Sequence, residues 1–402
     1  MTSENEFIQK KNNNKSREAY LPYSKQWIRE EDIQAVVDVL RGDYLTTGPY
    51  IDKFEQSIAK YVDAKYAVAF SSGTAALHGA CFAAGIQDGD EVITTPMTFA
   101  ASANCILYQG GTPVFVDIDR DTYNIDSRKV AQSITDRTKA IIPVDFTGQP
   151  ADLDEILEIA KANDLIVIED AAHALGATYK GRKVGSLSDM TMFSFHPVKQ
   201  ITTGEGGIIT TNNRAYYDKL IQFRSHGITR DKNKIKDSHG LWYYEMQFLG
   251  YNYRMTDIQA ALGISQLKKN EHFLKLRKKY AAMYNEAFSK MDLLDIPFQN
   301  QGIESSWHLY VIRLNLCKLR ASRKEIFEEL QKENIGVNVH YIPVHFQPYY
   351  SELGYRRGIC PNAEDLYECI ISLPLFPAMT ERDTEDVITA VKKVLLNYSK
   401  KL

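Results

Sequence analysis

From residue 67 onward, short continuous apolar runs alternate with longer segments in which apolar residues recur every three or four positions. Continuous apolar runs are typical of strands that helices cover on both faces. The alternation therefore predicts an α/β fold with a mostly parallel central sheet flanked by helices. The predicted strands are residues 67–70, 91–95, 113–118, 139–145, 165–170, 190–195 and 206–211, and the predicted helices are residues 29–40, 50–61, 74–84, 99–108, 127–134 and 153–163.

The pattern changes near residue 275, where a charge-rich segment leads into a second series of elements. This series predicts a smaller C-terminal α+β domain over residues 276–402, packed on a large domain over residues 21–275. Residues 1–20 are polar and lack the apolar core of a signal peptide, so we expect a flexible leader. In the small domain we predict helices at 280–291, 323–333, 363–370 and 384–396, a strand at 307–314 and an extended segment at 336–344.

Composition narrows the class of protein. The net charge of −3 gives no electrostatic reason to expect a nucleic acid as partner. No apolar run approaches the roughly 20 residues that span a bilayer, so no membrane association is expected. The cysteines are scattered and form no CxxC pair, which predicts no metal site, and Cys81 and Cys105 lie in apolar helical segments. Buried free thiols indicate a reducing compartment, and we expect a cytoplasmic protein.

The first predicted strand is followed by polar residues that could bind a ligand. Ser71, Ser72, Gly73 and Thr74 follow strand 67–70, and a helix begins at once. Free N–H groups and hydroxyls at a helix N-terminus form an anion site, although Ser and Thr are also common as simple helix caps. The dinucleotide fingerprint GxGxxG is absent, which disfavours an NAD-dependent oxidoreductase.

Two further strand ends carry an acid and an amine. Asp170 is the last residue of strand 165–170. At this position its carboxylate has two alternative roles, pairing with the protonated nitrogen of a heterocycle or capping the next turn. Lys199 follows strand 190–195 in a loop bounded by Pro197 and Gly204, where it is held against a ligand or exposed as a surface charge. Along the chain, a phosphate cradle comes first, then Asp170, then Lys199. This is the order of the groups in a pyridoxal-phosphate (PLP) site, where one cofactor uses all three.

Six segments stand out along the chain: SSGTAAL (71–77), TPMTF (95–99), EDAAHALG (169–176), SFHPVK (194–199), EGG (205–207) and NYRMTDIQAALGISQL (252–267). In this order they resemble the nucleotide-sugar aminotransferases of the DegT/DnrJ/EryC1/StrS family. The resemblance runs from about residue 23 to the C-terminus. It implies a type I PLP-dependent transferase fold and a homodimer with active sites shared between the subunits.

The resemblance also implies a role for each matching residue. Lys199 is the catalytic residue, which holds PLP as a Schiff base and moves the proton, and Asp170 pairs with the pyridine nitrogen. In sugar dehydratases of the family a His replaces this lysine, so the Lys found here implies transamination. The other implied cofactor contacts are Ser72, Gly73, Thr74 and Ser194 at the phosphate, Phe99 on the ring, His173 beside the cofactor, and Asn252 from the partner subunit. Phe99 as a core residue and Asn252 as a turn residue remain alternatives.

The segment NVHYIPVHFQPYY (338–350) resembles the family members of the pseudaminic acid pathway. That subgroup implies transfer of the amino group of L-glutamate to C4 of UDP-2-acetamido-2,6-dideoxy-β-L-arabino-hexos-4-ulose. The product is UDP-4-amino-4,6-dideoxy-N-acetyl-β-L-altrosamine. The alternatives are C4 amination of the D-xylo UDP-keto-sugar, as in bacillosamine-type pathways, C3 amination of a dTDP-keto-sugar, and a ligand-binding regulator, which would need an additional DNA-binding module.

By the same resemblance, His308, His340 and Tyr341 contact the sugar or its diphosphate. The two histidines could instead complete hydrogen bonds inside the small domain. The roles of Arg224 and Arg254 are also left open by the sequence. Each could bind a phosphate or carboxylate of a ligand or form a structural ion pair.

Overall fold

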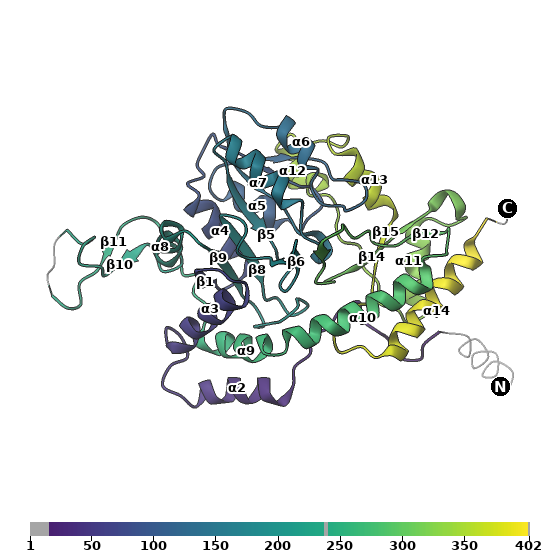
Figure 1. Cartoon of the computed structure of the whole chain (residues 1–402), viewed down its shortest axis with the longest axis horizontal. Helices are drawn as coiled ribbons and strands as arrows, with labels where there is room; N and C mark the ends of the chain where they lie inside the picture. The colour runs from purple at the N-terminus through teal and green to yellow at the C-terminus, as the bar shows by residue number, and fades with distance from the viewer. Residues whose placement is uncertain (1–15, 237–239, 401–402) are drawn as a thin grey trace.

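The computed structural model describes residues 16–236 and 240–400, and its main element is a seven-stranded sheet (Figure 1). The strand order is β1-β9-β8-β5-β4-β2-β3. β2, β3, β4, β5 and β8 pair in parallel, whereas β9 is antiparallel to both β1 and β8. The predicted mostly parallel sheet is confirmed. The strands are β1 (Tyr66–Phe70), β2 (Glu91–Thr94), β3 (Thr112–Phe115), β4 (Thr138–Ile142), β5 (Ile166–Asp170), β8 (Met190–Ser194) and β9 (Gly207–Thr211).

Helices cover both faces of this sheet, which explains why its strands are apolar throughout. In β1, Val68 and Phe70 pack into the core under one set of helices, while Ala67 and Ala69 pack into the core on the opposite face. Burying such a side chain stabilises the fold by about 1.5–3 kcal/mol for residues of the size of Val or Phe. The helices around the sheet are α2 (Glu30–Leu40), α3 (Pro49–Tyr61), α4 (Gly73–Ala83), α5 (Ala101–Leu107), α6 (Ser127–Gln132), α7 (Leu153–Ala162), α8 (Arg214–Phe223) and α9 (Asp257–Leu267).

The C-terminal part has its own core around a three-stranded antiparallel sheet of order β12-β14-β15. The strand β15 was not predicted, because its four residues continue directly from the helix before it. The elements are α10 (Asn270–Phe288), β12 (Leu294–Asp295), β14 (Tyr310–Leu314), α11 (Arg323–Lys332), α12 (Pro348–Glu352), α13 (Pro361–Cys369), β15 (Ile370–Leu373) and α14 (Glu381–Tyr398).

Helix α10 runs from beside the large sheet to the C-terminal core, so it crosses the predicted boundary at residue 275 (Figure 1). The division into residues 21–275 and 276–402 remains a prediction. Residues 1–15 of the expected leader lie outside the described residues. Ser16 and Arg17, by contrast, are held on the C-terminal part, since Ser16 donates to Glu333 and Arg17 pairs with Asp383 and Asp386.

Three short strands and one projecting arm complete the fold. Strands β10 (Ile228–Thr229) and β11 (Glu245–Met246) form an arm that extends away from the body (Figure 1). The strands β6 (Thr178–Tyr179), β7 (Arg182–Lys183) and β13 (Ile303–Glu304) join the two parts of the chain. Cys81 and Cys105 are buried free thiols, as predicted. Across the described residues, no helix is both long enough and apolar enough to cross a membrane.

Candidate active site

A cavity of about 570 Å³ lies where the strand ends of the large sheet meet the C-terminal part. Its volume falls within the range of roughly 300–1,000 Å³ typical of ligand sites. One side, here called the strand-end wall, consists of Ser72, Gly73, Thr74, Asp170, Ser194 and Lys199; the other, the C-terminal wall, consists of His308, Asn338, His340 and Tyr341. Of the residues predicted for the site, the cavity brings together all except Asn252.

The N-terminus of α4 faces this cavity and forms the expected cradle. Ser72 caps the helix, since its Oγ accepts a hydrogen bond from the N–H of Ala75 at 3.1 Å. Gly207 allows the approach, because a Cβ there would lie 2.5 Å from the carbonyl oxygen of Ser72 and 2.6 Å from the nitrogen of Gly73. A side chain at position 207 would therefore collide with the start of α4, which explains the glycine in the EGG motif. The helix cap and the predicted anion site lie at the same helix N-terminus.

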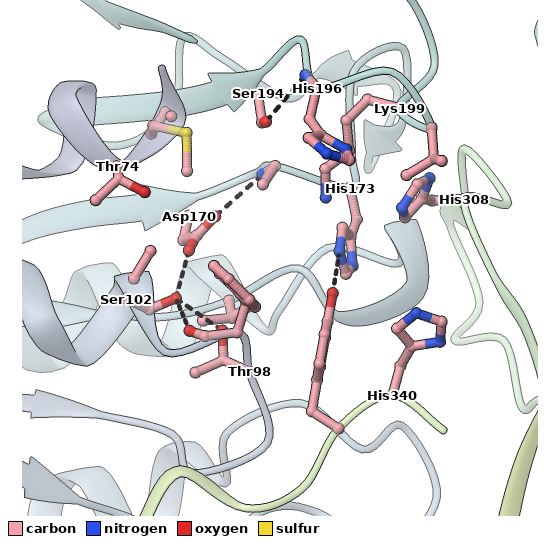
Figure 2. A pocket seen from close by; sticks show the side chains of 18 of the residues that line it. Thr74, Thr98, Ser102, Asp170, His173, Ser194, His196, Lys199, His308 and His340 are labelled. Carbon is pink, nitrogen blue, oxygen red and sulfur yellow. Dashed lines mark hydrogen bonds between the residues drawn. The ribbon is translucent and has the colours of Figure 1, made fainter. Parts of the chain in front are cut away.

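Asp170 is buried at the end of β5 and is fixed by two hydrogen bonds (Figure 2). Its Oδ2 accepts from the hydroxyl of Ser102 at 2.6 Å, and its Oδ1 accepts from the N–H of Ala172 at 3.1 Å. Burial raises the pKa of Asp170, whereas these two hydrogen bonds and the nearby charge of Lys199 favour the carboxylate. A cation brought against it would compensate for the lost hydration of the ionised form.

Lys199 lies in the turn after β8, where its N–H donates to the carbonyl of His196 at 3.0 Å. Burial lowers the pKa of its amine to about 8, and the nearby carboxylate of Asp170 opposes that shift. Because this pKa lies close to physiological pH, an appreciable minority of the amine is neutral there, as a nucleophilic or proton-transferring amine requires. The sequence alone could not distinguish it from a surface charge.

His173 and His308 lie against each other, with ring centroids 4.3 Å apart, and Nε2 of His173 shares a hydrogen bond of 3.0 Å with the hydroxyl of Tyr341 (Figure 2). Burial lowers the pKa of both histidines well below the usual value, so both are neutral. Nδ1 of each ring is buried and has no partner in the described part of the chain. Both rings also line the cavity.

His340 has contacts that agree with both interpretations given above, a substrate contact and a hydrogen bond inside the C-terminal part. Its Nδ1 shares a hydrogen bond of 2.8 Å with the hydroxyl of Ser372, within the C-terminal part, and its ring also lines the cavity. Burial lowers the pKa of His340 to about 3. Phe99 stands at the rim with 63% of its surface exposed, so it is not a core residue.

Three residues considered from the sequence do not line the cavity: Asn252, Arg224 and Arg254. Asn252 is exposed and pairs with Ser225 in an isolated bridge, so its own chain does not bring it into the site. Arg224 is structural, because its buried guanidinium pairs with Glu55 and also donates to the carbonyl of Ala69 at 2.6 Å.

Sequence reasoning missed several residues of the site. Ser102 holds Asp170, and Thr98 shares a hydrogen bond of 2.7 Å with Ser102. Both lie within four residues of Phe99, so the motif around Phe99 was the available signal. Tyr23 and Asn338 also line the cavity. Tyr23 lies far from any motif that carries chemistry, whereas Asn338 opens the segment 338–350, so that segment was the available signal for it.

Comparison with known proteins agrees with this geometry. The model of the DegT/DnrJ/EryC1/StrS aminotransferase family matches residues 26–392. The chain belongs to this family. It is a sugar aminotransferase with pyridoxal phosphate as its cofactor, and a keto-sugar and an amino donor are its classes of substrate.

Individual relatives share nearly the whole length of this aminotransferase. A spore coat polysaccharide biosynthesis protein of Bacillus subtilis, SpsC, is 45% identical over 94% of this chain and 98% of its own. An uncharacterised protein of Methanocaldococcus jannaschii is 50% identical over the same shares.

Solved structures extend the comparison. Helicobacter pylori PseC, an aminotransferase involved in the biosynthesis of pseudoaminic acid, has a TM-score of 0.87 at 32% identity, covering 95% of this chain and 100% of its own. Streptococcus pneumoniae Spr1654, described as a sugar aminotransferase, has a PMP form with a TM-score of 0.88 at 35% identity, covering 94% and 99%. Its PLP form matches with a TM-score of 0.87 at 34% identity over the same shares.

The residues of the cavity fit pyridoxal phosphate. They offer an anion cradle at a helix N-terminus, a buried carboxylate and an amine of lowered pKa, which are the groups that this cofactor needs. Among the described residues, no cluster of three His, Cys, Asp or Glu side chains could hold a metal ion.

Proposed function

We propose that this aminotransferase transfers the amino group of L-glutamate to C4 of UDP-2-acetamido-2,6-dideoxy-β-L-arabino-hexos-4-ulose. The product is UDP-4-amino-4,6-dideoxy-N-acetyl-β-L-altrosamine, an intermediate of pseudaminic acid biosynthesis. The observation that carries this proposal is the similarity to PseC over 95% of the chain. The segment that resembles the same subgroup also places His340 and Tyr341 on the C-terminal wall.

The strand-end wall would hold the cofactor. Ser72, Gly73, Thr74 and Ser194 would bind its phosphate, Asp170 its ring nitrogen, and Phe99 the face of its ring. When bound, pyridoxal phosphate supplies an electron sink that makes the Cα–H of an amino donor acidic. Asp170 supports that sink because a carboxylate stabilises the protonated ring nitrogen.

Lys199 would be both the attachment point and the proton carrier. Its pKa of about 8 lies close to physiological pH, so part of the amine is neutral there and Nζ can accept the proton that the donor Cα loses. His173 would lie beside the cofactor, held by Tyr341.

The C-terminal wall would bind the keto-sugar. His308 and His340 are neutral at physiological pH, since burial lowers the pKa of both. Neutral imidazoles hydrogen-bond hydroxyl and carbonyl groups but contribute no charge toward a diphosphate. We therefore assign His308, His340 and Tyr341 to the sugar ring rather than to the UDP phosphates.

The site would be completed by a second copy of the chain in a homodimer. The arm around β10 and β11 exposes several large apolar side chains, and contiguous patches of this kind indicate an interaction site. Asn252 is exposed within its own chain, which is the position required of a residue that reaches a partner's cofactor phosphate. The exposed apolar side chains are Leu241, Trp242, Tyr244, Met246 and Leu249.

The similarity to SpsC favours a second candidate. At 45% identity, this relative takes part in spore coat polysaccharide biosynthesis. The acceptor would then be a different keto-sugar nucleotide, such as the D-xylo UDP-keto-sugar aminated at C4 or a dTDP-keto-sugar aminated at C3. The strand-end wall would perform the same chemistry in either case.

The test is an amination assay with L-glutamate and each of these keto-sugar nucleotides, in which the product is analysed by NMR. We expect the L-arabino ketone to yield the 4-amino sugar of altro configuration. Amination of the D-xylo ketone or a dTDP-keto-sugar alone would contradict the proposal and support the second candidate.

A further inference from the structure

Two carboxyl groups beside Asp170 have no role in the reaction described above. Asp145 follows β4, and Glu169 immediately precedes Asp170 in β5. Both side chains have no exposed surface. The N–H of Asp145 donates to the carbonyl of Asp170 at 3.1 Å, so Asp145 is tied directly to the strand end that faces the cavity.

Each of these carboxyl groups has one satisfied oxygen and one without a donor. Oδ1 of Asp145 accepts from the N–H of Ala151 at 3.0 Å, and Oε2 of Glu169 accepts from the hydroxyls of Thr191 and Ser188 at 2.8 and 3.1 Å. Oδ2 of Asp145 and Oε1 of Glu169 have no hydrogen-bond donor in the described part of the chain. Leaving a buried polar atom unpaired costs about 1–3 kcal/mol.

The two carboxyl groups lie within hydrogen-bonding reach of each other. One proton placed between them would satisfy both unpartnered oxygens at once. Two adjacent carboxyl groups cannot both ionise at low cost, and they titrate as a pair.

Among the described residues, none of the groups that chiefly set the pKa of Asp145 or Glu169 carries a positive charge. The charged neighbour that acts on both members of the pair is Asp170, and the other contacts are neutral hydroxyls and a backbone N–H. Burial and these like charges raise the pKa of Asp145 and of Glu169. Without a retained proton, the ends of β4 and β5 would hold three adjacent carboxylates.

We propose that Asp145 and Glu169 share one proton at neutral pH and thereby position Asp170 as the ionised carboxylate that faces the cofactor nitrogen. The shared proton joins the ends of β4 and β5 by a hydrogen bond. It also limits the charge of the pair to −1, which reduces repulsion toward Asp170. This inference rests on pyridoxal phosphate as the cofactor and is independent of which sugar is aminated.

The first test uses infrared spectroscopy on the full-length protein at pH 7. A protonated carboxyl group absorbs apart from ionised ones, and we expect one such group to be lost in Asp145→Asn and also in Glu169→Gln. In each variant the new amide donates to the remaining carboxylate, so no proton is needed. Asp117→Asn is the matched control, because Asp117 is also buried but forms an ion pair with Lys129 at 2.9 Å, and this variant should leave the band unchanged. Persistence of the band in both pair variants would overturn the proposal.

The second test follows stability against pH. An unfolded Asp or Glu loses its proton near pH 4, whereas the folded pair retains it to higher pH because its pKa is raised. Stability of the wild type relative to Asp145→Asn should therefore fall as pH rises above about 4, by up to tenfold per pH unit in the folding equilibrium constant. Parallel stability profiles would contradict a shared proton.

The third test links the pair to the cofactor. Asp145→Asn keeps the pair's charge and hydrogen bond, so its affinity for pyridoxal phosphate should stay within about threefold of the wild type. Asp145→Ala leaves Oε1 of Glu169 without a partner and should weaken that affinity by about tenfold. Equal affinities of the two variants would show that the pair does not act on Asp170. None of these measurements requires a sugar substrate, so they separate this inference from the proposed reaction.

Discussion

The strand-end wall and the C-terminal wall of the cavity are built in different ways. Apart from Lys199 in the turn after β8, the strand-end wall lies on or directly beside regular elements, where Gly207 packs against the cradle and Ser102 and Ala172 hold Asp170. The C-terminal wall lies on irregular chain, where His340 is anchored to Ser372 and the N–H of His308 to the carbonyl of Thr147. Rigid strand ends suit chemistry that every substrate shares, whereas loops suit selection of one sugar.

The largest expected effect comes from the amine of the strand-end wall. Lys199→Ala should abolish the visible absorbance of the bound cofactor and reduce turnover by about 10⁴-fold or more, because attachment and proton transfer are both lost. Absorbance spectra and steady-state assays measure this. Normal turnover in this variant would remove the basis for assigning chemistry to this wall.

The next largest effect should come from the carboxylate of the same wall. Asp170→Asn removes the charge that stabilises a protonated ring nitrogen, and turnover should fall by about 10²-fold. Ser102→Ala removes only one hydrogen bond to Asp170 and should cost about tenfold. If Ser102→Ala were the more damaging variant, Asp170 would not act through its charge.

The pH dependence of cofactor attachment sharpens the electrostatic account. Attachment requires the neutral amine, and burial lowers the pKa of Lys199 to about 8. The rate should rise about tenfold per pH unit below that pKa and level off above it. The Asp170 carboxylate favours the charged amine, so Asp170→Asn should shift the profile to lower pH in stopped-flow measurements. A shift to higher pH would contradict this arrangement.

A mixing experiment tests whether the strand-end wall is completed by a partner subunit. Asn252→Ala should weaken cofactor retention several-fold, and mixing it with Lys199→Ala should restore about a quarter of the sites, since half of the dimers are hybrids with one intact site. Activity of the refolded mixture measures this. Absence of rescue would argue that Asn252 acts within its own chain or not at all.

The smallest effect is expected on the C-terminal wall. Tyr341→Phe removes the hydroxyl that we assign to the sugar ring, which should lower kcat/KM for the keto-sugar by about two- to tenfold. Steady-state kinetics at varied sugar concentration measures the loss, and the rate with L-glutamate should change little. An equal loss with both substrates would assign Tyr341 to the shared chemistry.

The two walls also differed in how far the sequence predicted them. Strands that end in Asp170 or lead to Lys199 were predictable, because continuous apolar runs and the motifs beside them are local signals. Ser102 could have been found from its position one turn after Phe99. Asn338 could have been found from its place in the segment 338–350, two positions before His340. Tyr23 could not, since only the packing of the chain brings it into the cavity.

The fold shows the same limit. The large sheet was predicted with small errors at its strand ends, but β15 was missed because Ile370 continues directly from helix α13. Helix α10 begins at Asn270, ten residues before the predicted start, because its charged first half packs beside the large sheet and was interpreted as a domain boundary. The proton that Asp145 and Glu169 are proposed to share depends on two strands meeting, which no single segment shows.

The division of labour between the two walls is tested most directly by measuring the two half-reactions separately in a rapid-mixing experiment. The account predicts that Asp170→Asn slows the reaction with L-glutamate and the reaction with the keto-sugar by similar factors. It predicts that His340→Gln slows only the reaction with the keto-sugar. If His340→Gln slowed both half-reactions equally, or if Asp170→Asn spared one of them, the two walls would not have the separate roles described.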